Sequence, residues 1–160
     1  MTTQVDFQLV RTSCLGDELT NQEAQVLAGV MDIRQLDDKE VLVGEGQADT
    51  TLFLLAEGRL EVINPAENSD DVVYTMRKGE CAGTRAFVDR SPRKATLRAA
   101  GKATIYMLEP ERFESLLESH PLIVYKIMRA LFRITHSNLM RMNLESAQLA
   151  KYIHRTGGRY

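Results

Sequence analysis

The feature that most constrains the fold is a succession of short apolar runs between residues 32 and 109, each with the composition of a β-strand. Turn signals such as Gly44-Glu45-Gly46, Glu57-Gly58 and Gly101 separate the runs. Closely spaced strands with such turns are typical of antiparallel sandwiches and barrels. The apolar runs are residues 33–36, 41–43, 52–55, 60–63, 72–76, 95–97 and 104–107.

Helical patterns flank these strands. Thr20 and Glu23 have the spacing of a capping box, in which two side chains satisfy free N–H groups at a helix start, and they predict a short amphipathic helix. Residues 1–19 are expected to form an irregular or partly helical arm. Pro110 suits the first turn of another short helix, which is expected to stop at His120-Pro121.

A much longer helix is predicted from about residue 122 to about residue 153. One small barrel cannot cover a helix of this length, so part of its apolar face is expected to pack on the sheet and the rest on a second copy or another partner. The alternative is a helix that lies wholly on its own domain. One face carries Ile123, Val124, Ile127, Ala130, Leu131, Ile134 and Met142, and the opposite face carries Lys126, Arg129, Arg133 and His136.

Composition excludes several classes of function. With 160 residues, of which 44% are hydrophobic and 26% charged, the chain is expected to form one soluble domain over residues 1–160. A net charge of -2 argues against a protein that coats DNA or RNA. No secretory signal or membrane span is expected, because the most apolar run, residues 122–128, is short and contains Lys126.

The cysteines and histidines do not form a pattern typical of an enzyme. Cys14 and Cys81 are too few for a disulfide scaffold and fit unpaired thiols in a reducing cytoplasm. Cys81 is expected to be a small buried side chain, and the alternative is a thiol whose pKa the nearby basic cluster lowers. The spacings of His120, His136 and His154 suit neither a metal site nor an acid-base pair, so no metal, cofactor or catalysis is predicted.

Positive charge is concentrated around the segment 79–96. Between Arg77 and Lys102 there are eight Lys and Arg residues against only Glu80 and Asp89. The segment also combines glycines, a short apolar patch and a Ser-Pro turn that precedes Arg93. Glycines let N–H groups converge, a helical turn adds the positive end of its dipole, and arginine offers a fork for phosphate oxygens. The segment therefore favours an anion site, the alternative being an ordinary surface loop with solvated cations.

Taken together, these residues closely resemble the cyclic-nucleotide-binding domain family. The resemblance rests on residues 39–46, similar to the strand and turn before the family's central hairpin, and on residues 52–62, similar to that hairpin. Its most specific part is the segment 83–96, which looks like the family's phosphate-binding cassette. The resemblance implies a mainly β fold, an antiparallel β-roll or jelly-roll over about residues 32–109, with a short N-terminal helix and C-terminal helices over about residues 110–154.

The resemblance also implies a set of ligand-binding residues. Arg93 matches the arginine that pairs with the cyclic phosphate, and Gly83 matches the glycine that opens the cassette. Arg85, Ala86 and Phe87 occupy the short helix whose N–H groups face the phosphate, and the long distal helix is expected to supply a lid. The implied ligand-binding residues are Gly83, Thr84, Arg85, Ala86, Arg93, Lys94, Ala95 and Thr96.

One position departs from the family pattern. Thr84 stands where nucleotide-binding members place a glutamate that hydrogen-bonds the ribose 2'-hydroxyl. Losing that acceptor in a closed pocket could weaken ribose binding by about a few kcal/mol, or up to several hundredfold. Glu80 would replace it only if the loop bent unusually. The pocket is then expected to hold a cyclic mononucleotide weakly, a different anion such as a cyclic dinucleotide, or nothing.

Two functions follow from these observations. The first is a small cytoplasmic, non-catalytic sensor of cAMP, cGMP or a related phosphate ligand, which forms a homodimer or contacts an effector through its long helix. The second is a ligand-free domain that acts as an interaction scaffold. A DNA partner is not expected, because the sequence has no room for a helix-turn-helix domain after the long helix.

Overall fold

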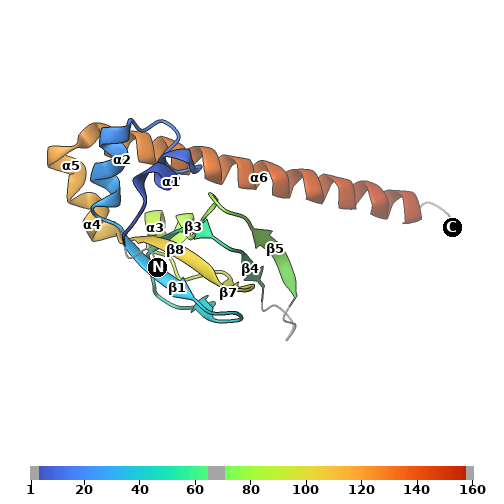
Figure 1. The fold of residues 1–160 in the computed structure, drawn as a ribbon. Helices are drawn as coiled ribbons and strands as arrows, with labels where there is room; N and C mark the ends of the chain where they lie inside the picture. The colour runs from blue at the N-terminus through green and yellow to red at the C-terminus, as the bar shows by residue number, and fades with distance from the viewer. Residues whose placement is uncertain (1–3, 65–70, 158–160) are drawn as a thin grey trace.

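The chain folds into a β-roll with helices on one side, from which the last helix projects (Figure 1). The computed structural model describes residues 4–64 and 71–157, with side chains up to residue 153. The helices are α1 (Phe7–Thr12), α2 (Asn21–Ala28), α3 (Thr84–Asp89), α4 (Pro110–Glu114), α5 (Leu116–Ser119) and α6 (Pro121–Gly157). The strands are β1 (Asp32–Leu36), β2 (Val41–Val43), β3 (Leu52–Glu57), β4 (Leu60–Ile63), β5 (Val72–Met76), β6 (Cys81–Ala82), β7 (Thr96–Ala99) and β8 (Ala103–Leu108).

Two four-stranded antiparallel sheets form the roll, with strand orders β1-β8-β3-β6 and β2-β7-β4-β5. This confirms the antiparallel β-roll and the flanking helices. The sequence also predicts a turn over residues 64–71, between two of the apolar runs, and it lies largely outside the described residues. The sequence pattern did not predict β6, because a strand of two residues is too short to show alternation.

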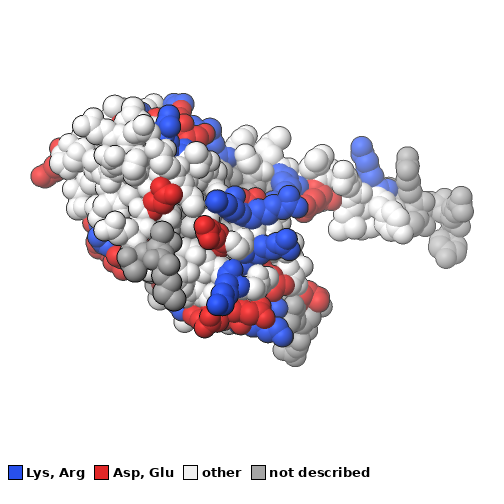
Figure 2. Space-filling view, in the orientation of Figure 1, with Lys and Arg blue, Asp and Glu red and all other residues white. Residues whose placement is uncertain are grey.

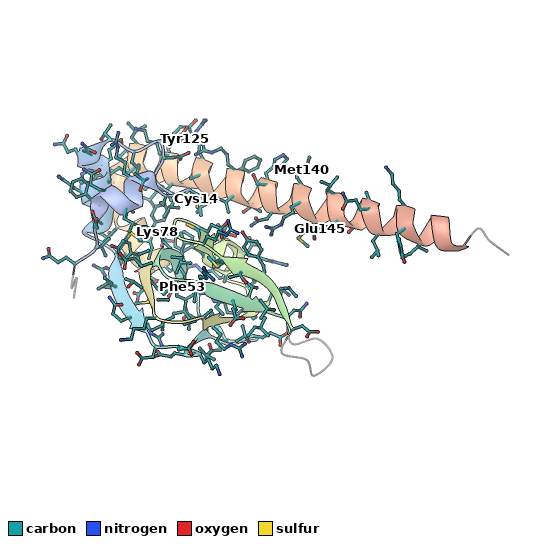
Figure 3. All side chains as sticks on the ribbon, turned by 45° about the vertical axis from the view of Figure 1, so that its right-hand side comes forward. Cys14, Phe53, Lys78, Tyr125, Met140 and Glu145 are labelled. Atoms are coloured by element: carbon teal, nitrogen blue, oxygen red, sulfur yellow. The ribbon has the colours of Figure 1, made fainter. Side chains whose placement is uncertain are left out.

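Strand β3 lies between two hydrophobic cores. Leu52 and Leu54 belong to the core that the helices cover, whereas Phe53 and Leu55 belong to the core between the sheets. Figure 3 shows Phe53 inside the roll. Successive side chains of a strand point to opposite faces, so a strand covered on both faces reads as a continuous apolar run. This explains why the sequence L-F-L-L-A is apolar without interruption.

The N-terminal segment confirms its predicted capping box. The Glu23 carboxylate accepts a hydrogen bond from the Thr20 N–H at 2.9 Å, and the Thr20 hydroxyl accepts one from the Glu23 N–H at 3.2 Å. Helix α1 makes the preceding arm partly helical, as expected. The short helix after Pro110 is divided into α4 and α5 at Ser115.

Helix α6 has two distinct halves. Its first three turns are anchored in the core by Ile123, Ile127 and Leu131, each at most 2% exposed. Its cationic face packs against acidic side chains of the N-terminal segment. Lys126 pairs with Glu23 at 2.7 Å, and Arg129 and Arg133 pair with acidic side chains of residues 17 and 18. Beyond Thr135 the described side chains are exposed. Among the described residues, no helix is both long and apolar enough to cross a membrane.

Candidate ligand-binding site

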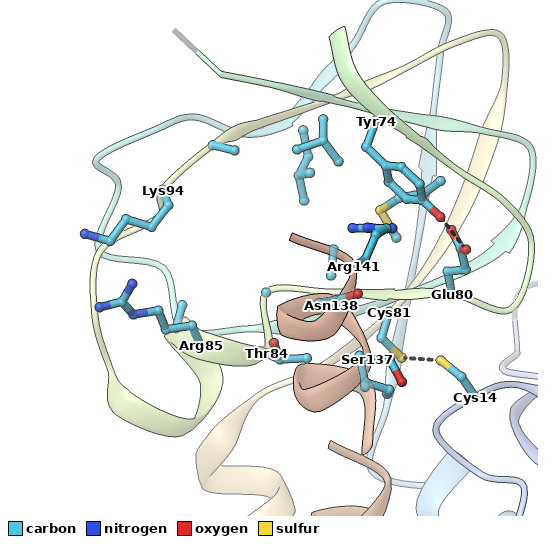
Figure 4. A pocket seen from close by; sticks show the side chains of 18 of the residues that line it. Cys14, Tyr74, Glu80, Cys81, Thr84, Arg85, Lys94, Ser137, Asn138 and Arg141 are labelled. Atoms are coloured by element: carbon cyan, nitrogen blue, oxygen red, sulfur yellow. Dashed lines mark hydrogen bonds between the residues drawn. The ribbon is translucent and has the colours of Figure 1, made fainter. Parts of the chain in front are cut away.

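A cavity of about 960 Å³ lies between the roll, α3 and the middle of α6 (Figure 4). It brings together seven of the eight residues expected to bind ligand, namely Gly83, Thr84, Arg85, Ala86, Arg93, Lys94 and Ala95. The eighth, Thr96, is not among the lining residues, and its hydroxyl accepts a hydrogen bond from the Glu45 N–H at 3.1 Å. The cassette therefore forms one wall of a real cavity.

Gly83 is the position where the backbone and the arginine approach most closely. It precedes α3 in the left-handed conformation, with φ of 85°. A Cβ atom there would collide with Nη1 of Arg93 and would lie 3.1 Å from the Thr51 carbonyl oxygen. Only glycine tolerates both this φ and this contact. The α3 helix that follows leaves its first N–H groups without acceptors inside the helix, on the cavity side of the cassette.

The Arg93 side chain is buried, with 5% exposure. Its Nη2 donates to the Thr51 carbonyl oxygen at 2.5 Å and to Oδ1 of Asp49 at 3.3 Å, and the guanidinium carbon lies 4.8 Å from the centre of the Phe53 ring. Within the part of the chain that the structure describes, Nε and Nη1 have no hydrogen-bond partner. Burial lowers the pKa of Arg93, and the nearby Asp49 carboxylate offsets this only in part. Because an unpartnered buried donor costs about 1–3 kcal/mol, these atoms are favourable contact points for an anion.

The opposite wall is built from Tyr74, Glu80 and Arg141. The Tyr74 hydroxyl donates to Oε1 of Glu80 at 2.6 Å, which raises the tyrosine's pKa. The guanidinium of Arg141 lies 4.6 Å from the centre of the Tyr74 ring. Helix α6 is thereby attached to β5 across the cavity.

Glu80 lies closer to the ligand site than the sequence suggested. The turn before it closes through a hydrogen bond from the Glu80 N–H to the Arg77 carbonyl oxygen at 3.1 Å, and Gly79 adopts a φ of 92°. This bend turns the Glu80 side chain toward the cavity that Thr84 also lines. Both carboxylate oxygens are already engaged, one by Tyr74 and the other by the Arg77 N–H at 2.9 Å.

Sequence reasoning expected a lid from the long helix but did not assign its residues. The structure places Arg133, Ser137, Asn138, Arg141 and Glu145 of α6 on the cavity. Arg133, Ser137, Arg141 and Glu145 follow one another at intervals of four residues, and Asn138 lies beside them, so the five share one side of the helix. Figure 3 shows Glu145 on the side of α6 that faces the roll, with Met140 on the other side. The available signal was the spacing of the polar residues after Ile134, which continues the apolar face of the first half, whereas Arg133 was expected on the opposite face.

Cations surround the cavity mouth. Arg85 and Lys94 are exposed and lie across the cavity from Tyr74 and Arg141 (Figure 4). Figure 2 shows Lys and Arg side chains gathered where the roll faces α6. The positions of these cations around the cavity therefore favour an anionic ligand, as the sequence predicted.

Cys81 also lines the cavity. It is partly buried and packs against the core that the helices cover, as the sequence favoured. The alternative of an acidic thiol is wrong, because the hydrogen bond with Cys14, whose sulfur is 3.6 Å away, and the burial of its own sulfur raise the pKa of Cys81. No group of three or more potential metal ligands occurs among the described residues.

Residues 33–120 match the sequence model of the cyclic nucleotide-binding domain. The chain belongs to this family. A cAMP-dependent protein kinase regulatory subunit of Mycosarcoma maydis is 26% identical over 87 residues, which are 54% of this chain and 17% of that protein. The chain spans only a minor part of the first curated relatives it matches, at 17%, 6% and 34% of their lengths.

Solved structures show the same fold. A cyclic nucleotide-binding domain of Methylobacillus flagellatus aligns with a TM-score of 0.76 at 20% identity, covering 84% of this chain and 76% of that one. The catabolite activator protein of Thermus thermophilus aligns with a TM-score of 0.71 at 19% identity, covering 84% of this chain and 63% of that one. These two likenesses show that the chain shares the fold of those domains.

Gly83→Ala should displace the Arg93 guanidinium, whereas Gly46→Ala should not. Both glycines have positive φ, but a Cβ at Gly46 would meet nothing within 4 Å. Both substitutions are expected to cost about 1–2 kcal/mol in backbone strain, and Gly83→Ala at least about 1 kcal/mol more from the collision. Urea unfolding of the two variants measures the difference. Equal losses would contradict the proposed close approach.

Asp49 should make the pairing with Arg93 sensitive to acid. Partial burial raises the pKa of Asp49, but the hydrogen bonds from Thr51 and the Arg93 guanidinium outweigh it and leave the pKa below its ordinary value of 3.8. The contribution of Asp49 to stability is therefore complete above 3.8 and is lost as the pH falls through the lowered pKa. Asp49→Asn should lower stability at neutral pH and should reduce the further loss of stability as the pH falls. The urea unfolding midpoint, measured as a function of pH, tests both effects. Asp89→Asn, an exposed change of equal charge, is the control, and parallel profiles for the wild type and Asp49→Asn would refute the assignment.

Proposed function

We propose that this chain is a regulatory domain that binds a cyclic nucleotide, cAMP or cGMP, through the buried guanidinium of Arg93. The observation that carries the proposal is the pair of unpartnered donors, Nε and Nη1, on a cation that is 5% exposed. A buried charge is tolerated where hydrogen bonds and an opposite charge complete its surroundings. Asp49 and Thr51 occupy only Nη2, so a phosphate oxygen is the natural partner for the remaining donors.

The site offers weaker hydrogen-bond acceptors to the ribose of a nucleotide than it offers donors to the phosphate. Thr84 supplies an uncharged hydroxyl, and both oxygens of the Glu80 carboxylate are held by Tyr74 and the Arg77 N–H. A ribose hydroxyl would have to displace Tyr74 to use that carboxylate. We therefore expect measurable but weak nucleotide affinity.

The proposed response to ligand passes through α6. Ser137, Asn138 and Arg141 form the lid side of the cavity, so a nucleotide that contacts them changes the preferred position of the helix. The proposal includes no catalytic step and no metal or cofactor. It places the domain in the cytoplasm, where the thiols of Cys14 and Cys81 would stay reduced.

Isothermal titration calorimetry with cAMP and with cGMP tests the binding. The wild-type chain should give saturable heat, Arg93→Ala should give none, and Arg59→Ala, which removes an exposed cation outside the cavity, should bind as the wild type does. Thr84→Glu should raise affinity about tenfold to several hundredfold by restoring a charged acceptor. Circular dichroism confirms that each variant is folded.

Two results would overturn the proposal. If only Thr84→Glu binds nucleotide, the native pocket has lost that activity, and the alternative of a ligand-free interaction scaffold replaces it. If the wild type and Arg93→Ala evolve the same heat, the guanidinium is not the anchor.

We further propose that two copies pair through an exposed apolar face of α6. Apolar side chains recur along it at the three- and four-residue steps of a coiled coil, and all are exposed. Two positions of this repeat are polar, and they are occupied by Thr135 and Ser146. The apolar side chains of this seam are Tyr125, Met128, Phe132, Leu139 and Leu149, together with Met142, which also lines the cavity.

Leu139→Asp should convert the proposed dimer into a monomer. Leu144→Asp is the matched control, because Leu144 is also exposed on α6, at 62%, but lies off the seam. A charge buried in the seam would lose its hydration without a partner, whereas the control charge stays in water. Light scattering after gel filtration measures the mass. A monomeric wild type, or equal effects of the two substitutions, would contradict the pairing.

A further inference from the structure

Two cysteines far apart in sequence meet at the wall of the cavity. Cys14 lies in the segment between α1 and α2, and Cys81 lies in β6. Their Sγ atoms are 3.6 Å apart, and both residues line the cavity (Figure 4). Both are free thiols of intermediate exposure. Nothing in the proposed nucleotide site requires this contact.

Backbone hydrogen bonds hold the two thiols in register. The Cys14 N–H donates to the Gly79 carbonyl oxygen at 3.1 Å, and the Gly79 N–H donates to the Leu55 carbonyl oxygen at 2.8 Å. Cys81 itself pairs with Leu54 of the buried strand β3. The segment that carries Cys14 is therefore fixed to the strand that carries Cys81. A disulfide, with its S–S distance of about 2.0 Å, requires only a small approach of the sulfurs.

The two thiols differ in reactivity. The hydrogen bond with Cys81 lowers the pKa of Cys14 despite its partial burial. The same hydrogen bond, together with burial, raises the pKa of Cys81. Because the thiolate is the nucleophile, Cys14 is suited to react first and Cys81 to react second.

We propose that Cys14 and Cys81 form a reversible oxidation site whose co-reactant is a hydroperoxide. The Cys14 sulfur attacks one peroxide oxygen and breaks the O–O bond, which gives a sulfenic acid and, with hydrogen peroxide, one water. The Cys81 sulfur then attacks the Cys14 sulfur, the S–O bond breaks, and a second water leaves with the Cys81 proton. The two thiols lose two electrons, the peroxide gains them, and a dithiol reductant reverses the change.

The disulfide would join two parts of the regulatory machinery. It would tie β6, directly before Gly83, to the segment whose Asp17 and Glu18 hold Arg133 and Arg129 of α6. Because both cysteines line the cavity, a bound nucleotide would cover them and slow their reaction with peroxide. This last coupling rests on the proposed nucleotide binding. Disulfide formation itself does not.

Peptide mapping tests the oxidation site on the full chain without nucleotide. The reduced protein is treated with hydrogen peroxide in equal amount and digested with trypsin without reductant. Cleavage after Arg11, Arg34, Lys78 and Arg85 should release peptide 12–34 linked to peptide 79–85, with two hydrogen atoms fewer than their sum. Titratable thiols should disappear and return after reduction.

Single substitutions separate the two roles. Cys81→Ser should leave a sulfenic acid on Cys14 that dimedone traps, whereas Cys14→Ser should react with peroxide more slowly. Thermal unfolding shows whether each variant is folded, and serine preserves the size of the side chain. Equal trapping in both variants would overturn the order of reaction.

Three outcomes would overturn the site itself. They are two thiols that stay titratable after peroxide, linkage only between different chains on a non-reducing gel, and linkage that forms only in urea. Failure to bind nucleotide would remove the protection by ligand but would leave the linked peptide unchanged. The two proposals therefore fail separately.

Discussion

The burial of one cation determines much of this structure. Arg93 lies against Phe53 of the doubly covered strand β3, beside a glycine that has no room for a Cβ, and next to a carboxylate and a carbonyl that satisfy one of its nitrogens. A guanidinium in such a place is costly when its other nitrogens lack acceptors. The fold keeps this cation in position with rigid elements, and the cassette brings further cations to the same side. The two Arg93 nitrogens without a partner among the described residues are the basis for the proposed binding of a small anion.

Helix α6 connects the proposed anion site with the rest of the molecule. Its first turns are part of the core, its middle lines the cavity, and its exposed face carries the proposed coiled-coil seam. The acidic residues between α1 and α2 hold the helix at the boundary between core and cavity, through Arg129 and Arg133. The stacking of Arg141 on Tyr74 adds a contact from the other sheet. The segment between α1 and α2 and strand β5 therefore both contact α6 at the cavity.

Local features were predictable from the sequence, and long-range ones were not. The capping box of Thr20 and Glu23, the turn glycines and the apolar run of β3 depend on residues a few positions apart, so the sequence pattern predicted them. The family resemblance supplied the cassette, including Gly83 and Arg93. The lid residues of α6, the position of Glu80 and the contact of Cys14 with Cys81, 67 residues away, depend on how separate elements meet in space. Local periodicity does not predict contacts between distant elements. The two-residue strand β6 is likewise recognised only from its pairing with β3.

The length of α6 has a mechanical consequence. At 37 residues it is about 55 Å long, and about 36 Å of it extends beyond Arg133. If such a helix tilts as a rigid body, it pivots about the point where it leaves the core. A tilt of about 10° there would sweep the tip through about 6 Å, roughly one helical pitch. A displacement at the cavity that is too small to alter the roll could thus become a change of register at the distant end.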